Sequence, residues 1–321
     1  VPQAAVNIVA ADWLPYALRL KRPWQTSRGE QNERQGSLLR LCTSDGLTGW
    51  GDAAPLPEFG ITESAAQAFA EECAHLDLLA QRAGLPLGQW LSGNEPVGEL
   101  AINANLGALA ALEPEMLATA ASQGFSVVKL KVGLAPVQQE VALLRQKLSG
   151  APVRVRLDAN RAWSVADAAY FVTQCAGLPI EGLEEPLAAP DTQSLAELQS
   201  RCDFPLAIDE STELIDDAFF RHPPVRRLII KPAREGGLLA SIEHALRAKA
   251  SGLEVVVTSS LESACGLLAC AHLAAAIAPE ATHGLGIADW FADDTGLPPA
   301  VSAGRLQLPD APGLGFQPIS R

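Results

Sequence analysis

Residues 126–158 read SVVKLKVGLAPVQQEVALLRQKLSGAPVRVRLD, and this stretch decides the fold. It holds a short strand-like run at 126–132, a helical stretch at 136–148 and a second strand-like run at 153–158. Two strands joined by a helix lie parallel, because the crossover returns the chain to the same end of the sheet. The stretch therefore predicts one βα unit of a parallel sheet.

The same alternation continues from about residue 97. Eight βα units in a row predict an α/β fold with a closed barrel rather than an open sheet. Further helices are expected at 113–122, 164–175 and 236–250. The expected strands lie at 100–106, 126–132, 153–158, 180–184, 205–209, 226–231, 254–259 and 282–287.

The first 95 or so residues follow another pattern. Residues 37–52 predict a hairpin that turns at Ser44-Asp45-Gly46. A helix is expected from Ser64 to Arg82, with Ser64 and Gln67 as a capping box and Gly84 at its end. Strands followed by a helix, without alternation, are typical of a small α+β domain.

Residues 21–36 are polar and carry no periodicity. They predict either a solvated connection or a mobile loop that closes over a site.

The composition excludes several classes of partner. The formal net charge is −13 and the sequence pI is about 4.9. Such a chain repels phosphate backbones and anionic lipids, so we expect no nucleic-acid or membrane partner. The most apolar segment, 264–278, contains His272 and is too short to span a bilayer.

The cysteines and histidines show no pattern of metal or disulfide chemistry. The six cysteines include no CxxC pair, so we expect small buried side chains in a reducing compartment. The five histidines lack ligand spacing, which argues against a zinc site. The first residues show no basic segment followed by an apolar core, so we expect no signal peptide and a cytoplasmic location.

Charged residues recur near the ends of five successive predicted strands. Lys131, Asp158, Glu184, Asp209 and Lys231 are separated by 27, 26, 25 and 22 residues. One βα unit of a barrel takes roughly 30 residues, so these charges stay in phase along successive strands. They are therefore expected at one height, near the carboxyl ends of the strands where barrel active sites form.

The lysines and carboxylates of this set stabilise one another's charges. Lys129 and Lys131 lie two apart on one strand, so both side chains point to the same face. Buried lysines are costly without anionic partners, and three neighbouring carboxylates repel one another without a cation. A hard ion with oxygen ligands, Mg²⁺ or Mn²⁺, satisfies both requirements.

Two other interpretations of these residues stay open at this point. A single Lys or Asp at a strand end is usually a surface residue or half of a salt bridge, although five in phase are not explained that way. A Schiff-base aldolase also places a lysine inside a barrel, but it needs one lysine and no carboxylate triad.

Six motifs resemble the muconate-lactonising branch of the enolase superfamily. They are VKLKVG (128–133), VRLDANRAWS (155–164), EGLEEPL (181–187), LAIDES (206–211), IIKPAREGG (229–237) and VTSSLESACG (257–266). GWGDAAPLPEFG (49–60) is similar to the capping domain of that family. The resemblance implies a modified TIM barrel, (β/α)7β, at 97–289, and an N-terminal α+β capping domain at 1–96 completed by about 290–321.

The resemblance also implies roles for single residues. Asp158, Glu184 and Asp209 match the metal ligands, for Mg²⁺ or Mn²⁺. Lys131 matches the general base that removes an α-proton to give a metal-stabilised enediolate, and Lys231 matches the opposing lysine. Three further positions, which either support the ligands or cap a helix, are Asn160, Glu185 and Glu210.

Within this branch, three features resemble the o-succinylbenzoate synthases: RLDANRAW with Arg156, IIKPAREGG, and the compact length of the chain with its Ser-rich strand end. Dipeptide epimerases typically carry Asp-x-Asp on the eighth strand, whereas residues 283–294 here read HGLGIADWFADD. The implied substrate is a small dicarboxylate, and its expected contacts are Lys129, Arg156, Asn160, Thr258, Ser259 and Ser260.

The implied reaction is dehydration of 2-succinyl-6-hydroxy-2,4-cyclohexadiene-1-carboxylate to o-succinylbenzoate, a step of menaquinone or phylloquinone biosynthesis. The alternatives are an N-acylamino acid racemase, or another epimerase or cycloisomerase of the same fold, and a barrel that has lost catalysis and only binds a ligand. The sequence leaves the oligomeric state open.

Overall fold

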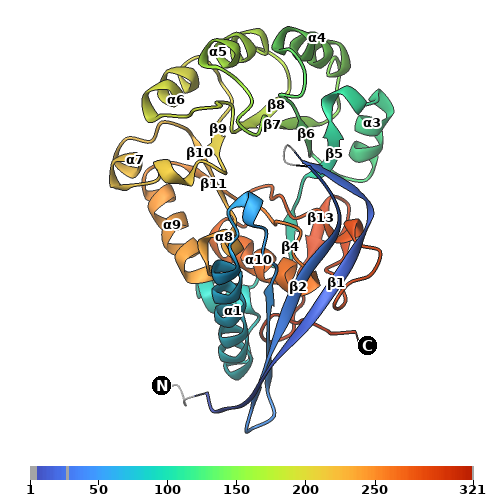
Figure 1. Cartoon of the computed structure of the whole chain (residues 1–321), viewed down its shortest axis with the longest axis vertical. Coiled ribbons are helices and arrows are strands. Elements are labelled where there is room, and N and C mark those ends of the chain that lie inside the picture. Colours follow the sequence, from blue (N-terminus) through green and yellow to red (C-terminus); the bar gives the residue numbers. More distant parts are fainter. Residues whose placement is uncertain (1–5, 27–28, 320–321) are drawn as a thin grey trace.

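The computed structural model describes residues 6–26 and 29–319. Figure 1 shows a barrel ringed by helices and, beside it, a long hairpin that reaches toward the barrel. The predicted fold class, an α/β barrel with an N-terminal α+β cap, is confirmed. The proposed domain boundaries, 1–96 with 290–321 and 97–289, stay a prediction.

The cap is a three-stranded antiparallel sheet in the order β1-β2-β3, formed by Ile8–Thr26, Gly29–Thr43 and Thr48–Ala53. The hairpin predicted at 37–52 is confirmed, with its turn after Thr43. The prediction of a connection or loop at 21–36 is wrong for the described residues, which lie in β1 and β2. Where it extends from the cap, at 21–24 and 31–36, this hairpin is mostly exposed, so backbone pairing holds it there without apolar alternation.

Helix α1 (Glu63–Ala83) packs against this sheet and is followed by α2 (Leu87–Ser92). The predicted capping box at Ser64 and Gln67 is wrong, because Thr62 caps the helix by accepting a hydrogen bond from Ala65 N at 3.1 Å. The predicted stop at Gly84 is confirmed, with φ of 69°. Gly49 and Gly51 of β3 let α1 approach closely, since a Cβ at either would collide with a helix carbonyl.

Seven parallel strands form the barrel sheet in the order β11-β10-β9-β8-β7-β6-β5. Their bounds are Ala104–Ala108 (β5), Val127–Lys131 (β6), Arg154–Asp158 (β7), Ile180–Glu184 (β8), Leu206–Ile208 (β9), Arg227–Ile230 (β10) and Glu254–Val257 (β11). The helices between and after them are Pro114–Ser122 (α3), Val137–Lys147 (α4), Val165–Gln174 (α5), Thr192–Gln199 (α6), Asp217–Arg221 (α7), Pro232–Glu235 (α8), Leu238–Ala250 (α9) and Ala264–Ile277 (α10).

The first and last predicted strands differ from expectation. The run at 100–106 splits into β4 (Glu99–Ala101) and β5, and β4 pairs instead with β13 (Arg305–Gln307), which also pairs with β12 (Val301–Ser302). Residues 282–287 form bridges rather than a strand, linking Ile102 to His283 and Thr258 to Gly284. These bridges close the barrel between β11 and the start of β5, and we call residues 282–287 the seam.

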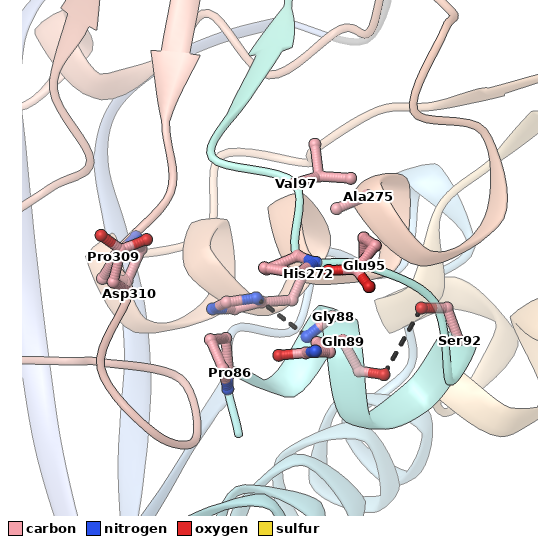
Figure 2. A pocket seen from close by; sticks show the side chains of 11 residues that line it. Pro86, Gly88, Gln89, Ser92, Glu95, Val97, His272, Ala275, Pro309 and Asp310 are labelled. Carbon is pink, nitrogen blue, oxygen red and sulfur yellow. Dashed lines mark hydrogen bonds between the residues drawn. The ribbon is translucent and has the colours of Figure 1, made fainter. Parts of the chain in front are cut away.

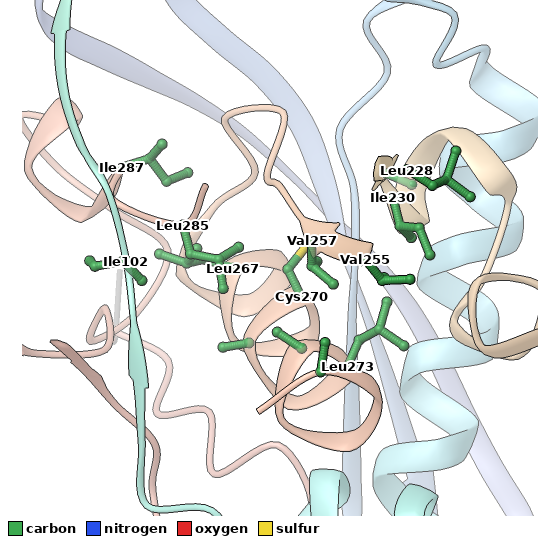
Figure 3. Close-up of a cluster of buried hydrophobic side chains, with 14 of the residues drawn as sticks. Ile102, Leu228, Ile230, Val255, Val257, Leu267, Cys270, Leu273, Leu285 and Ile287 are labelled. Atoms are coloured by element: carbon green, nitrogen blue, oxygen red, sulfur yellow. The ribbon is translucent and has the colours of Figure 1, made fainter. Parts of the chain in front are cut away.

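Helix α10 lies in the core and is buried along nearly its whole length. Figure 3 shows Leu267, Cys270 and Leu273 of this helix beside Val255 and Val257 of β11. The apolar segment at 264–278 is therefore a core helix of the barrel. None of the described helices combines the length and the apolar character that crossing a bilayer requires.

His272 ties α10 to the cap and to the C-terminal segment. Its Nδ1 accepts a hydrogen bond from Gly88 N at 3.1 Å, as Figure 2 shows, and its Nε2 lies 3.2 Å from Leu314 O. Burial lowers the pKa of His272 to about 4. The imidazole is therefore neutral near pH 7 and acts as a fixed hydrogen-bonding strut.

A buried ionic network lies inside the barrel, toward the amino ends of β8 and β10. Glu181 receives two hydrogen bonds from Arg156 (2.8 and 3.1 Å) and two from Arg227 (2.9 and 2.7 Å). Gly182 leaves the room that this requires, because a Cβ there would lie 2.5 Å from Arg227 Nη1. Burial alone would raise the pKa of Glu181, but the two guanidinium groups outweigh it and lower the pKa to about 2.

This pKa shift predicts an acid-sensitive contribution to stability. A lowered carboxylate pKa stabilises the fold above the unfolded value of 4.5, and the contribution is lost as pH falls from 4.5 toward 2. Glu181→Gln should lower the free energy of unfolding by roughly 3 kcal/mol at pH 7, with the gap to wild type narrowing below pH 4.5. Urea denaturation at several pH values measures this gap.

Glu254→Gln is the matched control, because Glu254 bonds the same Arg227 but its side chain is 58% exposed. That change should cost less than about 1 kcal/mol. Equal losses for the two variants would contradict the network's importance.

Candidate active site

A cavity of about 460 Å³ opens at the carboxyl ends of the barrel strands. The predicted site residues that line it are Lys129, Lys131, Asp158, Asn160, Asp209, Glu210, Lys231, Thr258, Ser259 and Ser260. They come from β6, from the end of β7, and from the segments that directly follow β7, β9, β10 and β11. The structure thus gathers ten residues that the sequence spreads over more than a hundred positions.

Strand register explains why the charges meet. Lys131 pairs with Asp158, and Asp158 pairs with Glu184, so three of the five residues form one row across β6, β7 and β8. Asp209 directly follows β9 and Lys231 directly follows β10. In the strand order, β6 and β10 are separated by three strands, so Lys131 and Lys231 stand on opposite walls.

Lys129 holds two of the carboxylates together. Its Nζ lies 2.9 Å from Asp158 Oδ2 and 2.5 Å from Glu184 Oε2. Burial alone would lower the pKa of Lys129, but the charges of Asp158, Glu184 and Asp209 outweigh it and raise the pKa. Lys129 is therefore a fixed ammonium.

Asp209 has two cationic partners of its own. Lys231 Nζ lies 2.5 Å from Asp209 Oδ2, and Arg234 Nη1 lies 2.9 Å from Oδ1. Burial opposes ionisation of Asp209, but these cations outweigh it and lower its pKa well below the usual range. The sequence analysis missed Arg234, although it stands within the quoted IIKPAREGG motif, three residues after Lys231.

Lys131 differs from the other two lysines. Within the described part of the chain it forms no ion pair, although it lines the cavity. Burial lowers the pKa of Lys131, and the nearby Lys129 charge lowers it further, while Asp158 opposes both. Lys131 is thus the lysine best suited to accept a proton.

The glutamates that follow two of the predicted ligands act as supports. Glu185 Oε1 accepts hydrogen bonds from the backbone of Asp209 (2.7 Å) and Ser211 (2.8 Å), which fixes the end of β9. Glu210 Oε1 accepts a hydrogen bond from Asn160 Nδ2 at 2.8 Å. Burial, together with Asp209 and Asp158, raises the pKa of Glu210 to about 7.

The alternative that these residues cap helices is wrong. The side chains that cap the neighbouring helices are instead Ser164, before α5, and Asp191, before α6.

Arg156 does not reach the cavity, so the prediction of a substrate contact is wrong. Its side chain is 1% exposed, and besides Glu181 it bonds Thr282 O at 3.0 Å. A guanidinium two residues before Asp158 lies one level deeper in the barrel, where it pairs with the buried carboxylate.

Aromatic side chains line the cavity, and Trp24 among them lies in the segment 21–36 that the sequence analysis considered as a loop over a site, although it named none of these residues. Trp24 stacks on Phe59 with ring centroids 5.2 Å apart, and Arg22 lies 4.6 Å from the ring centroid of Trp290. All four residues line the cavity. The hairpin is held there by a bridge between Leu20 and Phe291.

Comparison with known proteins identifies the family. The model of the enolase C-terminal domain-like family matches residues 111–320, more than half of the chain. This chain belongs to the enolase superfamily. It is therefore an enzyme of a superfamily whose members share this barrel and cap.

Its relatives within the superfamily differ in reaction. The o-succinylbenzoate synthase of Pasteurella multocida is 31% identical over 80% of this chain and 82% of its own. The L-Ala-D/L-Glu epimerase of Bacillus subtilis is 26% identical over 84% of this chain and 85% of its own. A dipeptide epimerase from Enterococcus faecalis, solved with Mg and a dipeptide, has a TM-score of 0.83 at 23% identity, covering 97% of this chain and 99% of its own.

The side chains present fit the hard divalent cation expected in an enolase-superfamily site. Glu184 Oε1, Glu210 Oε2 and Asn160 Oδ1 are buried without a hydrogen-bond partner in the structure. Buried oxygens of this kind are the ligands that Mg²⁺ and Mn²⁺ prefer. Among the residues that the structure describes, however, no three His, Cys, Asp or Glu side chains are arranged so that they could hold a metal ion together. Lys129, Lys231 and Arg234 hold the carboxylates instead.

Metal binding should be measurable without an assay of turnover. Free Mg²⁺ at a hundred times its Kd should stabilise the fold by about 2.7 kcal/mol. Glu184→Gln should abolish this stabilisation while leaving the metal-free protein folded, because the change relieves repulsion from Asp158. Thermal unfolding with and without Mg²⁺ or Mn²⁺, after treatment with EDTA, measures both effects.

Glu213→Gln is the control, since Glu213 pairs with Arg161 at the surface with its side chain 56% exposed. It should respond to metal as wild type does. A full metal response in Glu184→Gln would remove Glu184 from the ligand set.

Proposed function

We propose that the enzyme catalyses the Mg²⁺-dependent dehydration of 2-succinyl-6-hydroxy-2,4-cyclohexadiene-1-carboxylate to o-succinylbenzoate. The observation that carries the proposal is one cavity with an unpaired Lys131 on one wall and an ion-paired Lys231 on the other. The product belongs to menaquinone or phylloquinone biosynthesis.

Lys131 serves as the base. Its neutral Nζ takes the proton from the carbon next to the substrate carboxylate, and the bond from the ring to the 6-hydroxyl then breaks. The proton carried by Lys131 leaves with that hydroxyl as water, and the ring becomes aromatic. One lysine is sufficient when both events occur on the same face.

The remaining charges hold the substrate's negative charge. Asp158, Glu184 and Asp209 are the proposed ligands of Mg²⁺, which when bound neutralises the charge that develops on the substrate carboxylate. Lys231, paired with Asp209, remains a fixed positive charge on the far wall. Lys129 keeps its ammonium near the same carboxylates and, after burial, helps to lower the pKa of Lys131.

The cavity suits a small dianion. Lys129 and Lys231 line it together with Asp158 and Asp209, so a bound Mg²⁺ would supply the positive charge that offsets the repulsion of an anionic substrate by the net charge of −13. Thr258, Ser259 and Ser260 present hydroxyls on one side, and the aromatic rings of Trp24, Phe59 and Trp290 cover the top. These groups are the proposed contacts of the succinyl tail and the ring.

The seam favours the synthase over a dipeptide epimerase. Its contribution to the cavity lining is Gly284, Gly286 and Ile287, none of which can pair with the ammonium group of a dipeptide. The 31% identity to several o-succinylbenzoate synthases supports the same assignment.

An N-acylamino acid racemase is the second candidate. Lysines on both walls are what a racemase needs, because it removes a proton from one face and returns one to the other. The 26% identity to an epimerase supports this possibility as well.

Two lysine variants separate the candidates. Lys131→Ala removes the base, so it should lower kcat for every reaction by at least about a thousandfold. Lys231→Arg keeps a positive charge but offers no neutral amine, because arginine stays protonated. A dehydratase should therefore retain measurable turnover in Lys231→Arg, while any racemase activity should vanish.

Both activities are measured on one preparation, with the cyclohexadiene substrate and with an N-succinyl amino acid in deuterated water. A wild type that racemises the amino acid efficiently and fails to dehydrate the cyclohexadiene would replace the synthase by the racemase. Borohydride added during turnover should leave the protein mass unchanged, because no imine forms on either lysine.

A further inference from the structure

A buried polar cluster joins the cap to the barrel just outside the cavity. Tyr16 and Arg34 come from the β1–β2 hairpin and Asp52 from β3, while Glu262 and Ser263 follow β11. Each of these five side chains is buried. We call this cluster the cap–barrel node.

Arg34 is the cationic member of the node, and its guanidinium donates hydrogen bonds to three backbone carbonyls. Its Nε donates to Leu261 O at 3.2 Å, Nη1 to Pro55 O at 2.9 Å and Nη2 to Ala54 O at 2.9 Å. Leu261, which supplies one of these carbonyls, and Leu56, which follows Pro55, line the cavity. One guanidinium therefore joins a cap loop to a barrel loop at the cavity wall.

The barrel loop needs such support, because its backbone is strained. Leu261 has φ of 59°, in the left-handed region that a leucine adopts at a cost of about 1 kcal/mol or more. Such a conformation persists where the surroundings fix it. Arg34 holds the carbonyl of Leu261 itself.

The rest of the node holds the residues on either side. Ser260 N donates to Glu262 Oε2 at 2.6 Å, which ties the loop before Leu261. Ser263 donates from N and from Oγ to Asp52 Oδ2, both at 2.9 Å, and Tyr16 Oη donates to Asp52 Oδ1 at 2.6 Å. The loop is thus bonded to the cap after Leu261, through Ser263 and Asp52, and to its own Glu262 before Leu261, through Ser260.

The segment before this loop presents three hydroxyls to the cavity. Thr258 Oγ1, Ser259 Oγ and Ser260 Oγ are buried and have no hydrogen-bond partner among the described residues. All three residues line the cavity. Buried hydroxyls without partners are costly unless a ligand or water bonds them, so their exact placement matters for what the cavity binds.

We propose that Arg34 is a positioning residue, which fixes the left-handed turn at Leu261 and so sets the hydroxyls of Thr258, Ser259 and Ser260 against the substrate. The proposal rests on the proposed function, because it assigns these hydroxyls to the same substrate. Arg34 itself does not line the cavity and acts only through the wall that it holds.

The first test is a comparison of kcat with KM. Arg34→Gln should raise KM for the cyclohexadiene substrate about tenfold and leave kcat within about threefold, since the wall binds ground state and transition state alike. Arg34→Lys keeps the charge and one hydrogen bond, so it should recover part of the loss. If Arg34→Gln does not fold, Arg34→Lys carries the comparison.

Arg40→Gln is the matched control. Arg40 lies on the same strand, but it pairs with Asp12 at the surface, with side chains 42% and 43% exposed. It should leave both constants unchanged. A fall in kcat without a change in KM for the Arg34 variants would indicate only a loss of folded enzyme and would overturn the proposal.

A double-mutant cycle tests whether Arg34 acts through the hydroxyls. If it does, Ser260→Ala should raise KM, and Arg34→Lys should then add little in the Ser260→Ala background. Additive effects would show that Arg34 acts elsewhere, and the assignment would fail.

Amide hydrogen exchange separates this proposal from the proposed function. In Arg34→Lys, peptides covering 258–263 and 54–56 should exchange at least about tenfold faster than in wild type, while peptides covering 127–131 should not change. A wild type that does not dehydrate the cyclohexadiene refutes the proposed function alone. Unchanged exchange at 258–263 refutes the positioning role of Arg34, whatever the reaction.

Discussion

Repulsion among three carboxylates is the constraint around which this molecule is arranged. Asp158, Glu184 and Asp209 stand at the carboxyl ends of neighbouring strands, and burial opposes the ionisation of Glu184 and Asp209. Three cations offset that cost: Lys129 bridges the first two, and Lys231 with Arg234 holds the third. The same charged side chains are the ones that we propose to hold a divalent ion and to bind an anionic substrate. Stability and chemistry therefore depend on one set of contacts.

Much of this could be predicted from the sequence, because the barrel imposes a period. A charge that recurs once per βα unit must lie at a constant height, and the pairing of Lys131 with Asp158 and of Asp158 with Glu184 follows that rule. Periodicity reports which face of a strand a residue occupies but not how deep it lies. Arg156 illustrates the limit: it shares its face with Asp158, yet lies one level lower, against Glu181.

Other features carried no periodic signal. The β1–β2 hairpin is polar on both faces where it extends from the cap, so its strands look like a loop in the sequence. Thr62 rather than Ser64 caps α1, a choice between two similar side chains that only the backbone geometry decides. Arg34 and Asp52 meet residues more than two hundred positions away, and no local pattern marks such contacts.

The seam at 282–287 carries a consequence for how this enzyme could change over evolutionary time. It closes the barrel through bridges at His283 and Gly284 instead of a full ladder, and the backbone hydrogen bonds of these two residues run to Ala101, Asn103, Val257 and Ser259. Yet Gly284 packs so tightly that a Cβ would lie 2.6 Å from Thr258 Cγ2, and one at Gly286 would lie 2.7 Å from Asn103 O. A single inherited change here would move the cavity wall while leaving the lysines and carboxylates in place. The residues proposed to carry the chemistry stand at the strand ends, whereas the seam supplies glycines of the cavity wall whose replacement would reshape the space for the substrate.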